Sequence, residues 1–292
     1  MSDFLDNLVE RIVDYVEASH SNKHKTVNFL PASSREKVTD LSLPLEGHGS
    51  QAILDDLDEF LKQCVKTNRP EFMNPLWGGL NVAGFAGEVV AALTNQSMYT
   101  YELSPIATLI EKAVIERMME IVGFGEGFGT LTTGGSNGNM LGMLCARQYA
   151  NPMSSLNGFD GTKYVAFVSE EAHYSVLMSA NVLGIGYQNL VKVKCDASGR
   201  MKPESLIDEI NRVTADGRVP FCIIATSGTT VRGAFDPLRE IANIAHDNDI
   251  WLHVDAAWGG SCLFSRRYRG LMDGIELVDS ICWDAHKMMG LP

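Results

Sequence analysis

The first 65 residues contain two stretches in which hydrophobic residues recur at helical spacing. In residues 3–18 and 50–65 the apolar side chains fall on one side of a helix, with charged side chains between them. Ser50 is a candidate N-cap for the second stretch. The segment between the two contains Pro31 and Pro44 and indicates an extended arm or linker. The pattern therefore predicts two amphipathic helices joined by irregular chain.

A third helix is expected to begin at Pro105, because Ser104 can cap it and proline is favoured at the first helical position. The glycine-rich stretch 123–129 is predicted to be a loop that no helix follows directly. The expected core face of the helix consists of apolar side chains at helical spacing, namely Ile106, Leu109, Ile110, Ala113, Val114 and Ile121.

Beyond Gly129 short β-branched runs alternate with helical stretches. Strands are predicted near residues 164–168, 190–194, 221–226, 250–255 and 278–283. Helices are predicted near residues 138–150, 174–183, 203–214 and 237–248. Short apolar strands separated by helices favour an α/β fold, in which helices cover both faces of a mostly parallel sheet. Because ligands of such sheets bind at the carboxyl ends of the strands, the residues just after each strand are the candidates for chemistry.

Composition narrows the class of protein. The 292 residues suggest about two domains, and a hydrophobic fraction of 45% is ample for a large core. The net charge of −12 opposes non-specific binding to nucleic acid or anionic membranes. No apolar run approaches the roughly 18 to 20 residues of a membrane helix, and the acidic start lacks the features of a secretory signal. We therefore expect a soluble protein with no nucleic-acid or membrane partner.

The six cysteines lie far apart and form no C-x-x-C pair. Without a secretory signal they are expected to be reduced thiols, mostly in the core. A zinc site is not indicated, and the expected compartment is the cytoplasm.

A glycine-rich turn at residues 132–139 opens one of the predicted helices. Small residues before a helix let backbone N–H groups approach an anion, and the helix dipole adds a favourable potential. The spacing is G-G-x-x-G rather than the G-x-G-x-x-G of dinucleotide sites, and the turn lacks G-K-[ST]. With these two nucleotide-binding patterns absent, the ligand that the turn could bind is a single phosphate. On its own, however, such a turn more often reflects tight packing.

Two charged residues follow predicted strands. Asp255 ends one strand, where a buried carboxylate either caps the next turn or meets a cation. Most lysines are solvated, but partial burial of Lys287 after the last strand would lower its pKa and make its amine nucleophilic. A lysine, a strand-end aspartate and a phosphate-binding turn are the parts needed to hold pyridoxal phosphate. His173, more often structural in such a place, is flat enough to stack on the cofactor ring.

Two other kinds of site find little support. A metal site formed by His173, His253 and His286 lacks H-E-x-x-H or any short paired spacing. No G-x-S-x-G elbow supports a serine triad.

Several motifs lie around these strand ends: H-V-D-A-A-W-G-G at 253–260, A-T-S-G-T-T-V-x-G-A-F-D-P at 225–237 and D-x-H-K-M-M-G at 284–290. Others are F-M-N-P-L-W-G-G-L at 72–80, M-Y-T-Y-E-L-S-P at 98–105 and S-E-E-A-H-Y-S at 169–175. Together they resemble the group II pyridoxal-phosphate decarboxylases, in the branch with glutamate and cysteine sulfinate decarboxylases. The resemblance runs from about Pro70 to the last residue. It implies the fold-type-I, aminotransferase-like architecture and a homodimer with active sites near the subunit interface.

The resemblance also implies an activity and a role for each matching residue. The activity is pyridoxal-phosphate-dependent decarboxylation of an acidic L-amino acid, namely glutamate, aspartate or cysteine sulfinate, to the amine and CO2. Lys287 would form the Schiff base, Asp255 would pair with the ring nitrogen, and His173 would stack over the ring. The other implied cofactor-binding positions are Ala257 on the opposite ring face, Gly135, Ser136 and Asn137 at the phosphate, and Thr230 and His286 beside the cofactor.

Three positions near the implied substrate pocket depart from the glutamate-decarboxylating pattern. Ser97 and Tyr99 stand where that branch has N-x-F, and they resemble the users of cysteine sulfinate and aspartate. Pro75, the third position, replaces a glutamine. Outside these three, Asp284 stands where relatives often have asparagine. These residues keep the expected substrate acidic but leave its identity open, with neutral drift at a pocket wall as the alternative.

The expected division is an N-terminal helical segment at 1–70 and a large cofactor-binding domain at 71–292. The chain ends five residues after Lys287, whereas relatives continue into a small C-terminal domain, so a fragment of an active enzyme is expected. Two alternatives stay open. One is a decarboxylase of an aromatic or other amino acid, and the other is an inert relative that acts as a binding protein.

Overall fold

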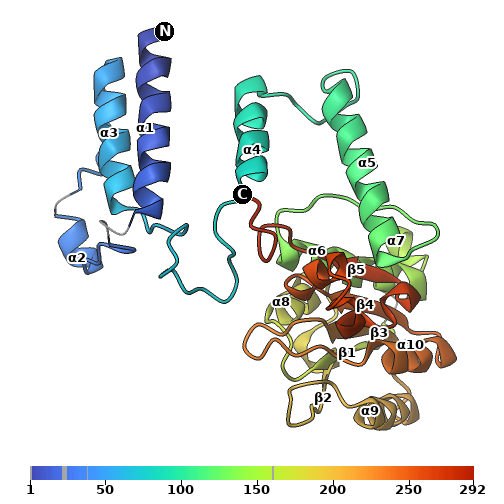
Figure 1. Cartoon of the computed structure of the whole chain (residues 1–292). Coiled ribbons are helices and arrows are strands. Elements are labelled where there is room, and N and C mark those ends of the chain that lie inside the picture. The colour runs from blue at the N-terminus through green and yellow to red at the C-terminus, as the bar shows by residue number, and fades with distance from the viewer. Residues whose placement is uncertain (1, 22–24, 38, 160) are drawn as a thin grey trace. The chain divides into compact units, whose positions relative to one another are not determined.

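A computed structural model describes residues 2–21, 25–37, 39–159 and 161–292 (Figure 1). The chain forms two compact units. One comprises residues 1–75 with 79–81, and the other comprises residues 76–78 with 82–292. None of the described helices is long and apolar enough to cross a membrane.

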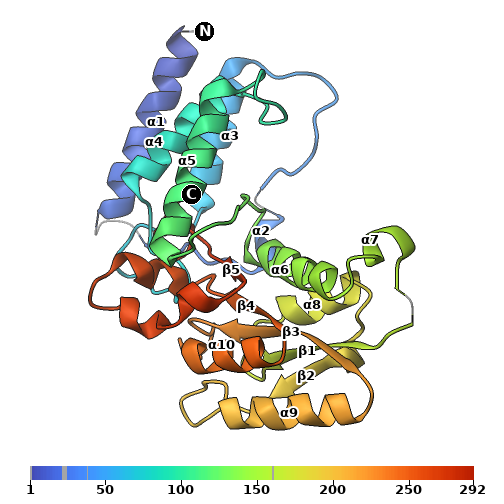
Figure 2. The same cartoon turned by 90° about the vertical axis from the view of Figure 1, so that its right-hand side faces the viewer.

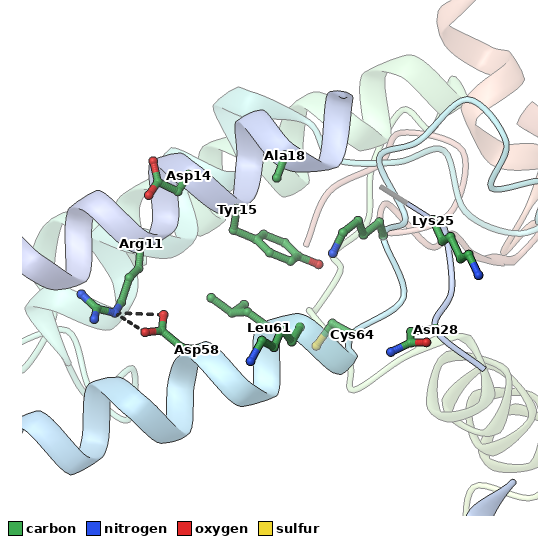
Figure 3. Close-up of a pocket in the computed structure, with 11 residues that line it drawn as sticks. Arg11, Asp14, Tyr15, Ala18, Lys25, Asn28, Asp58, Leu61 and Cys64 are labelled. Atoms are coloured by element: carbon green, nitrogen blue, oxygen red, sulfur yellow. Dashed lines mark hydrogen bonds and ion pairs between the residues drawn. The ribbon is translucent and has the colours of Figure 1, made fainter. Parts of the chain in front are cut away.

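The first unit is built on two helices, α1 (Ser2–His20) and α3 (Ser50–Gln63). Arg11 of α1 pairs with Asp58 of α3 at 2.9 Å, and the ring of Tyr15 points from α1 toward α3 (Figure 3). Both helices match the predicted ranges. The N-cap of α3 is Gly49, however, so the prediction of Ser50 at that position is wrong.

The segment between these helices is not wholly extended as predicted. It contains a short helix, α2 (Ala32–Arg35). A proline is tolerated at the start of a helix, because the first N–H groups of a helix have no intrahelical partner. The carbonyl of Pro31 accepts hydrogen bonds from the N–H groups of Ser34 and Arg35, which closes this turn.

The second unit contains a five-stranded sheet in the order β2-β1-β3-β4-β5, with every neighbouring pair parallel. The strands are β1 (Tyr164–Ser169), β2 (Leu190–Val193), β3 (Val219–Thr226), β4 (Trp251–Asp255) and β5 (Ser280–Cys282). All five lie where the apolar runs predicted them. The prediction of an α/β fold with a mostly parallel sheet is confirmed.

Helices cover both faces of this sheet (Figure 2). On one face, α6 (Gly135–Ala150) and α8 (Ser175–Val182) pack on strand residues that include Ala166, Val168 and Ile224. On the other face, α9 (Pro203–Ala215) and α10 (Leu238–Asp247) pack on their neighbours in the strands, which include Val165, Phe167 and Ile223. Strand side chains alternate between faces, so each strand supplies both cores. The four helices match the predicted ranges.

Short helical elements complete the unit: α7 (Ser154–Asn157) and 3-10 helices at Tyr187–Asn189, Gly259–Phe264, Arg269–Met272 and Ile275–Leu277. The glycine-rich stretch at 123–129 is a loop, as predicted. All six cysteines are free thiols, but only Cys222, Cys262 and Cys282 are buried, so the expectation that most lie in the core is wrong.

Two further helices, α4 (Val82–Thr94) and α5 (Pro105–Val122), expose apolar surface. Helix α4 was not predicted. Helix α5 begins where expected, but the side chain of Ser104 hydrogen-bonds Gln96 at 2.7 Å rather than the helix.

The predicted core face of α5 is wrong except at Ile121, which is partly buried and packs against the core. Ile106, Leu109, Ile110, Ala113 and Val114 are all exposed, with Ile106 63% exposed. The opposite side, with Ile115, Met118 and Met119, turns inward. A helix with apolar residues on both sides carries no periodic signal that selects one side for the core.

Helix α6 approaches the sheet closely because it presents glycine to it. A Cβ atom at Gly142 would lie 2.3 Å from Nδ1 of His253 on β4, and one at Gly138 would lie 2.6 Å from Sγ of Cys282 on β5. Only a residue without a side chain fits either position at the observed spacing.

Replacing Gly142 by alanine is therefore expected to destabilise the fold by roughly 1–3 kcal/mol, because the new methyl group overpacks against His253. Gly270 is the matched control, since its Cβ would meet no atom within 4 Å and it lies in the short helix Arg269–Met272. Alanine at Gly270 is expected to be neutral or stabilising by up to about 1 kcal/mol. Chemical denaturation measures both, and equal stability of the two variants would contradict the packing account.

Candidate active site

A cavity of about 410 Å³ lies at the carboxyl ends of the strands, beside the N-terminus of α6. It is lined by all nine residues that the sequence assigned to the cofactor: Gly135, Ser136, Asn137, His173, Thr230, Asp255, Ala257, His286 and Lys287. Strand register explains part of this convergence, because Asp255 pairs with Thr226 on β3 and with Cys282 on β5. The predicted cofactor residues therefore come together at one site.

The three predicted substrate residues do not line this cavity. Ser97 and Tyr99 lie between α4 and α5, both are exposed, and Tyr99 is 87% exposed. Pro75 belongs to the first unit. Their role in substrate choice stays a prediction.

The glycine-rich turn does open a helix, as predicted. Gly134 has φ 141°, a conformation that favours glycine, and α6 begins at the next residue. A Cβ atom at Gly135 would lie 2.7 Å from Oδ2 of Asp284, so glycine is needed there for β5 to reach the turn. Free N–H groups and the dipole of a 16-residue helix give this end a positive potential that suits a phosphate.

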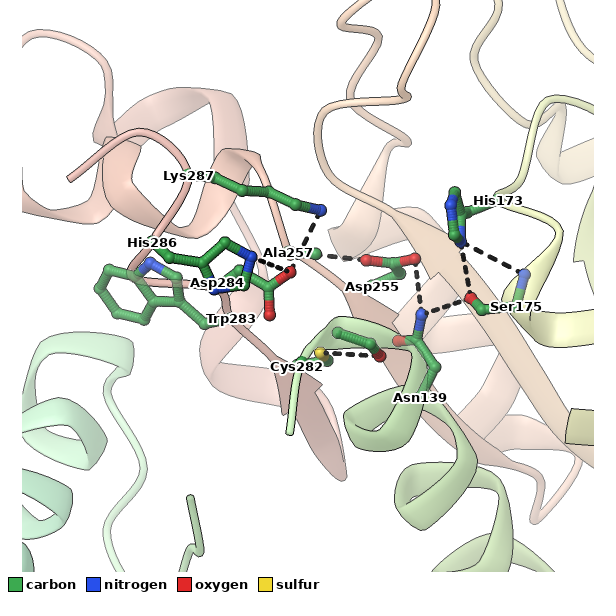
Figure 4. Close-up of polar contacts among 12 residues, drawn as sticks. Asn139, His173, Ser175, Asp255, Ala257, Cys282, Trp283, Asp284, His286 and Lys287 are labelled. Atoms are coloured by element: carbon green, nitrogen blue, oxygen red, sulfur yellow. Dashed lines mark hydrogen bonds and ion pairs between the residues drawn. The ribbon is translucent and has the colours of Figure 1, made fainter. Parts of the chain in front are cut away.

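Lys287 lies just beyond β5, in a turn in which its N–H donates to the carbonyl of Asp284 at 3.3 Å. Its amine is 3.1 Å from Oδ2 of Asp284, and its side chain is 21% exposed (Figure 4). Nε2 of His286 lies 3.7 Å from the same oxygen. The lysine is thus partly buried, as its proposed chemistry requires, and a carboxylate balances its charge.

Asp255 ends β4 and is 5% exposed. Its Oδ1 accepts a hydrogen bond from the N–H of Ala257 at 3.1 Å, and its Oδ2 accepts one from Nδ2 of Asn139 at 2.8 Å. The first of the two roles considered for this carboxylate, capping of the next turn, is therefore correct, because it binds the N–H of Ala257. It also lines the cavity, where it can meet a cation.

His173 follows β1 and is partly buried. Its Nδ1 lies 2.9 Å from Oγ of Ser175 and accepts the N–H of Ser175 at 3.2 Å. Burial lowers the pKa of His173 and Lys287 acts in the same direction, while Asp255 opposes the shift. The imidazole is therefore neutral at pH 7, with its proton on Nε2.

The loop after β3 carries Thr230 and is held by a buried acid. Asp236 accepts hydrogen bonds at 2.7 Å from the N–H groups of Thr226 and Met201, and burial raises its pKa to about 6. No role was predicted for Asp236, although it stands in the motif at 225–237.

Three further residues contact the site and were missed. Asn139 and Ser175 stand within quoted motifs without a role, and His253 was considered only as a metal ligand. All three are buried, and Asn139 links Asp255 to Ser175. Only Asn139 could have been found from the sequence. It lies one helical turn after Gly135, which places it on the side of α6 that faces the site.

Comparison with known proteins identifies the family of the chain. Residues 31–292 match the family described as the pyridoxal-dependent decarboxylase conserved domain. The chain belongs to this family. The resemblance stated from the motifs is thereby confirmed, and pyridoxal phosphate is the family's cofactor.

Named relatives agree with this assignment. The chain is 41% identical over 283 residues to acidic amino acid decarboxylase GADL1 of Mus musculus, covering 97% of the chain and 51% of that protein. It is 40% identical over 270 residues to mouse cysteine sulfinic acid decarboxylase, covering 92% and 55%. The chain thus spans about half the length of the curated relatives it matches.

Solved structures show the same fold. The crystal structure of mouse CSAD in apo form has a TM-score of 0.97 and 37% identity, and the match covers 100% of this chain and 62% of that one. Oryza sativa TDC with PLP and tryptamine has a TM-score of 0.87 at 23% identity and supports the fold alone. The prediction of the fold-type-I architecture is confirmed.

The residues of the cavity fit pyridoxal phosphate. They offer an amine for its aldehyde, a buried carboxylate for its ring nitrogen and a helix N-terminus for its phosphate. Oγ1 of Thr226 also lines the cavity region, is buried and has no hydrogen-bond partner within the described residues. Such a group is expected to find its partner in a ligand.

Proposed function

We propose that the protein is a pyridoxal-phosphate-dependent decarboxylase of an acidic L-amino acid. The observation that carries this proposal is the convergence of Lys287, Asp255 and the N-terminus of α6 on one cavity. The names of the relatives support the substrate class, because one acts on acidic amino acids and another on cysteine sulfinic acid. Glutamate, aspartate and cysteine sulfinate are the candidate substrates.

The chemistry that pyridoxal phosphate supplies when bound is an electron sink for the pair left behind as CO2 departs. The protein orients this chemistry. Lys287 would hold the cofactor through its amine, and the N–H groups at the start of α6 would bind the phosphate. The buried carboxylate of Asp255 keeps a proton on the ring nitrogen, since it favours a cation beside it.

The remaining residues shape the cavity. Neutral His173 would stack over the ring, and the small side chain of Ala257 would pack against its other face. Thr230 and His286 would complete the wall beside the cofactor. Together these residues would orient the substrate beside the cofactor.

Release of CO2 from a panel of amino acids tests the proposal on the chain supplied with pyridoxal phosphate. We expect turnover of at least one of glutamate, aspartate and cysteine sulfinate, and none of aromatic or basic amino acids. If only an aromatic amino acid were turned over, the proposed acidic substrate class would be wrong, and the protein would be an aromatic amino acid decarboxylase. Stoichiometric cofactor binding without any turnover would support the inert binding protein instead.

We propose that residues 1–70 form an N-terminal helical segment and that residues 71–292 belong to the large cofactor-binding domain. We also propose a cytoplasmic location, which the six free thiols support because unpaired cysteines persist in reducing compartments.

We further propose a homodimer that buries the apolar surfaces of α4 and α5. In α4, Leu93 is 81% exposed, and almost every other side chain of this helix is exposed as well. Contiguous exposed apolar surface of this kind marks an interface, and a second copy is the partner that every solution of the protein contains. Ser97 and Tyr99 lie between these helices, so a second copy would enclose the predicted substrate residues.

Ile110→Glu is expected to weaken the dimer by roughly two orders of magnitude, because it buries a charge in an apolar contact. Ile207→Glu is the matched control, since Ile207 is an exposed isoleucine on α9, outside the proposed interface. Sedimentation equilibrium measures both association constants. A monomeric wild-type chain, or equal effects of the two variants, would contradict the proposed interface.

A further inference from the structure

A chain of hydrogen bonds leads from two partly buried residues, Trp251 and Ser280, to the buried residues beside the cavity. It starts at the indole of Trp251, whose Nε1 lies 2.8 Å from Oγ of Ser280. Oγ of Ser280 lies 2.8 Å from Nδ1 of His253, and Nε2 of His253 lies 3.0 Å from Oδ1 of Asn139. Nδ2 of Asn139 reaches Oδ2 of Asp255 at 2.8 Å.

Asn139 also joins the second polar residue of the site. Its Nδ2 lies 3.1 Å from Oγ of Ser175, which in turn lies 2.9 Å from Nδ1 of His173. Figure 4 shows Asn139 rising from α6 between Asp255 and Ser175. The amide of Asn139 thus contacts Asp255 directly and is linked to His173 through Ser175.

The donors and acceptors of this chain have a single consistent direction. The carboxylate of Asp255 accepts from Nδ2 of Asn139, so Oδ1 of Asn139 faces His253 and can only accept from it. The single proton of the neutral His253 ring therefore lies on Nε2, and its Nδ1 accepts the proton of Oγ of Ser280. Oγ of Ser280 in turn accepts the indole N–H of Trp251, and the second N–H bond of the amide is left for Ser175.

The reverse orientation of the amide is disfavoured at two points. It would set Oδ1 of Asn139 against the carboxylate of Asp255 and its Nδ2 against the N–H of His253. Both Asn139 and His253 are 1% exposed, so water cannot relieve either mismatch. Burial lowers the pKa of His253 to about 4 while Asp255 opposes the shift, so this imidazole is neutral with one proton to place.

The packing of α6 reserves space for this arrangement. Gly142 lies against the ring of His253, where a Cβ atom would come within 2.3 Å of Nδ1. The helix therefore approaches β4 closely enough for Asn139, three residues earlier, to reach both His253 and Asp255.

We propose that Asn139 is a positioning residue for Asp255, held in one amide orientation by Trp251, Ser280 and His253. In this orientation it donates to Oδ2 and fixes the plane of the carboxylate that lines the cavity. The part of this inference that concerns the cofactor rests on the proposed function. The direction of the hydrogen bonds does not, because it is a property of the chain alone.

The first test is NMR of the wild-type chain labelled with 15N-histidine, without cofactor. The resonances of His253 are expected to report a neutral ring protonated on Nε2 alone. Ser280→Ala removes the donor to Nδ1 and is expected to introduce the other tautomer. Ser261→Ala is the matched control, because Oγ of Ser261 also accepts an indole N–H, from Trp283 at 3.1 Å, but lies outside the chain. A wild-type His253 protonated on Nδ1 would overturn the proposal.

The second test is the dissociation constant of pyridoxal phosphate, followed by its absorption. Ser280→Ala is expected to raise it about tenfold, and Ser261→Ala less than twofold. Asn139→Asp keeps the acceptor for His253 but sets a second carboxyl group against Asp255. This variant is expected to raise the constant at least 100-fold and to alter the spectrum of the bound cofactor, which a merely structural role would leave unchanged.

Equal cofactor affinity and spectrum in Asn139→Asp and wild type would overturn the positioning role. If Asn139→Asp fails to fold, Ser280→Ala and the wild-type NMR measurement still decide it. A wild-type chain that binds no pyridoxal phosphate would instead count against the proposed function, while the histidine tautomers would still judge the hydrogen-bond chain.

Discussion

Lys287→Ala is expected to lower the rate of decarboxylation by roughly three to five orders of magnitude and to abolish the absorption band of covalently bound cofactor. The variant removes the amine that lies 3.1 Å from Asp284 at the end of β5. Pyridoxal phosphate could still bind by its phosphate and ring, so its affinity should fall less than the rate. Single-turnover kinetics and absorption spectra of the same samples measure the two effects separately.

Lys192→Ala is the control for this experiment, because Lys192 is an exposed lysine on β2 that does not line the cavity. It should retain both the band and the rate. A Lys287→Ala variant that keeps the band would mean that another amine binds the cofactor.

Asp255→Asn is expected to lower turnover by about two to four orders of magnitude. The amide keeps the shape of the side chain and an acceptor for the N–H of Ala257, although it loses the acceptor for Nδ2 of Asn139. It cannot hold a proton on the ring nitrogen. The loss should fall on kcat more than on KM, because the charge matters most as electrons move into the ring. Steady-state kinetics with the preferred substrate measure this division.

Asp279→Asn is the matched control. Asp279 is an aspartate that accepts the N–H of Leu252 at 2.7 Å, and it is exposed and does not line the cavity. It is expected to change stability but to leave kcat within about threefold. Near-normal kcat in Asp255→Asn would contradict the electrostatic role of the carboxylate.

The sheet could be predicted because its strands are short apolar runs buried on both faces, a pattern that few other elements produce. Helix α4 could not be predicted in the same way. Its sequence contains two glycines and almost no polar residues, so it has no amphipathic period. The prediction of the core face of α5 was wrong for a related reason. Apolar residues occupy both sides of this helix, so the periodicity does not indicate which side faces the core.

The site was predictable where strand ends carry its chemistry. Asp255 and Lys287 follow β4 and β5, and a parallel sheet brings such positions to one edge. Asn139 was not predictable from spacing, because its function depends on a contact with Asp255, which is 116 residues away in sequence. The substrate residues Ser97 and Tyr99 depend on whatever covers the exposed chain between α4 and α5, which the sequence of one copy does not reveal.

Borohydride reduction followed by peptide mapping shows which lysine binds the cofactor. The wild-type chain is saturated with pyridoxal phosphate, its imine is reduced to a stable amine, and mass spectrometry locates the modified lysine. We expect one cofactor per chain, attached to Lys287, with no label in Lys287→Ala. Attachment to another lysine, or label scattered over the exposed lysines, would contradict the role proposed for Lys287.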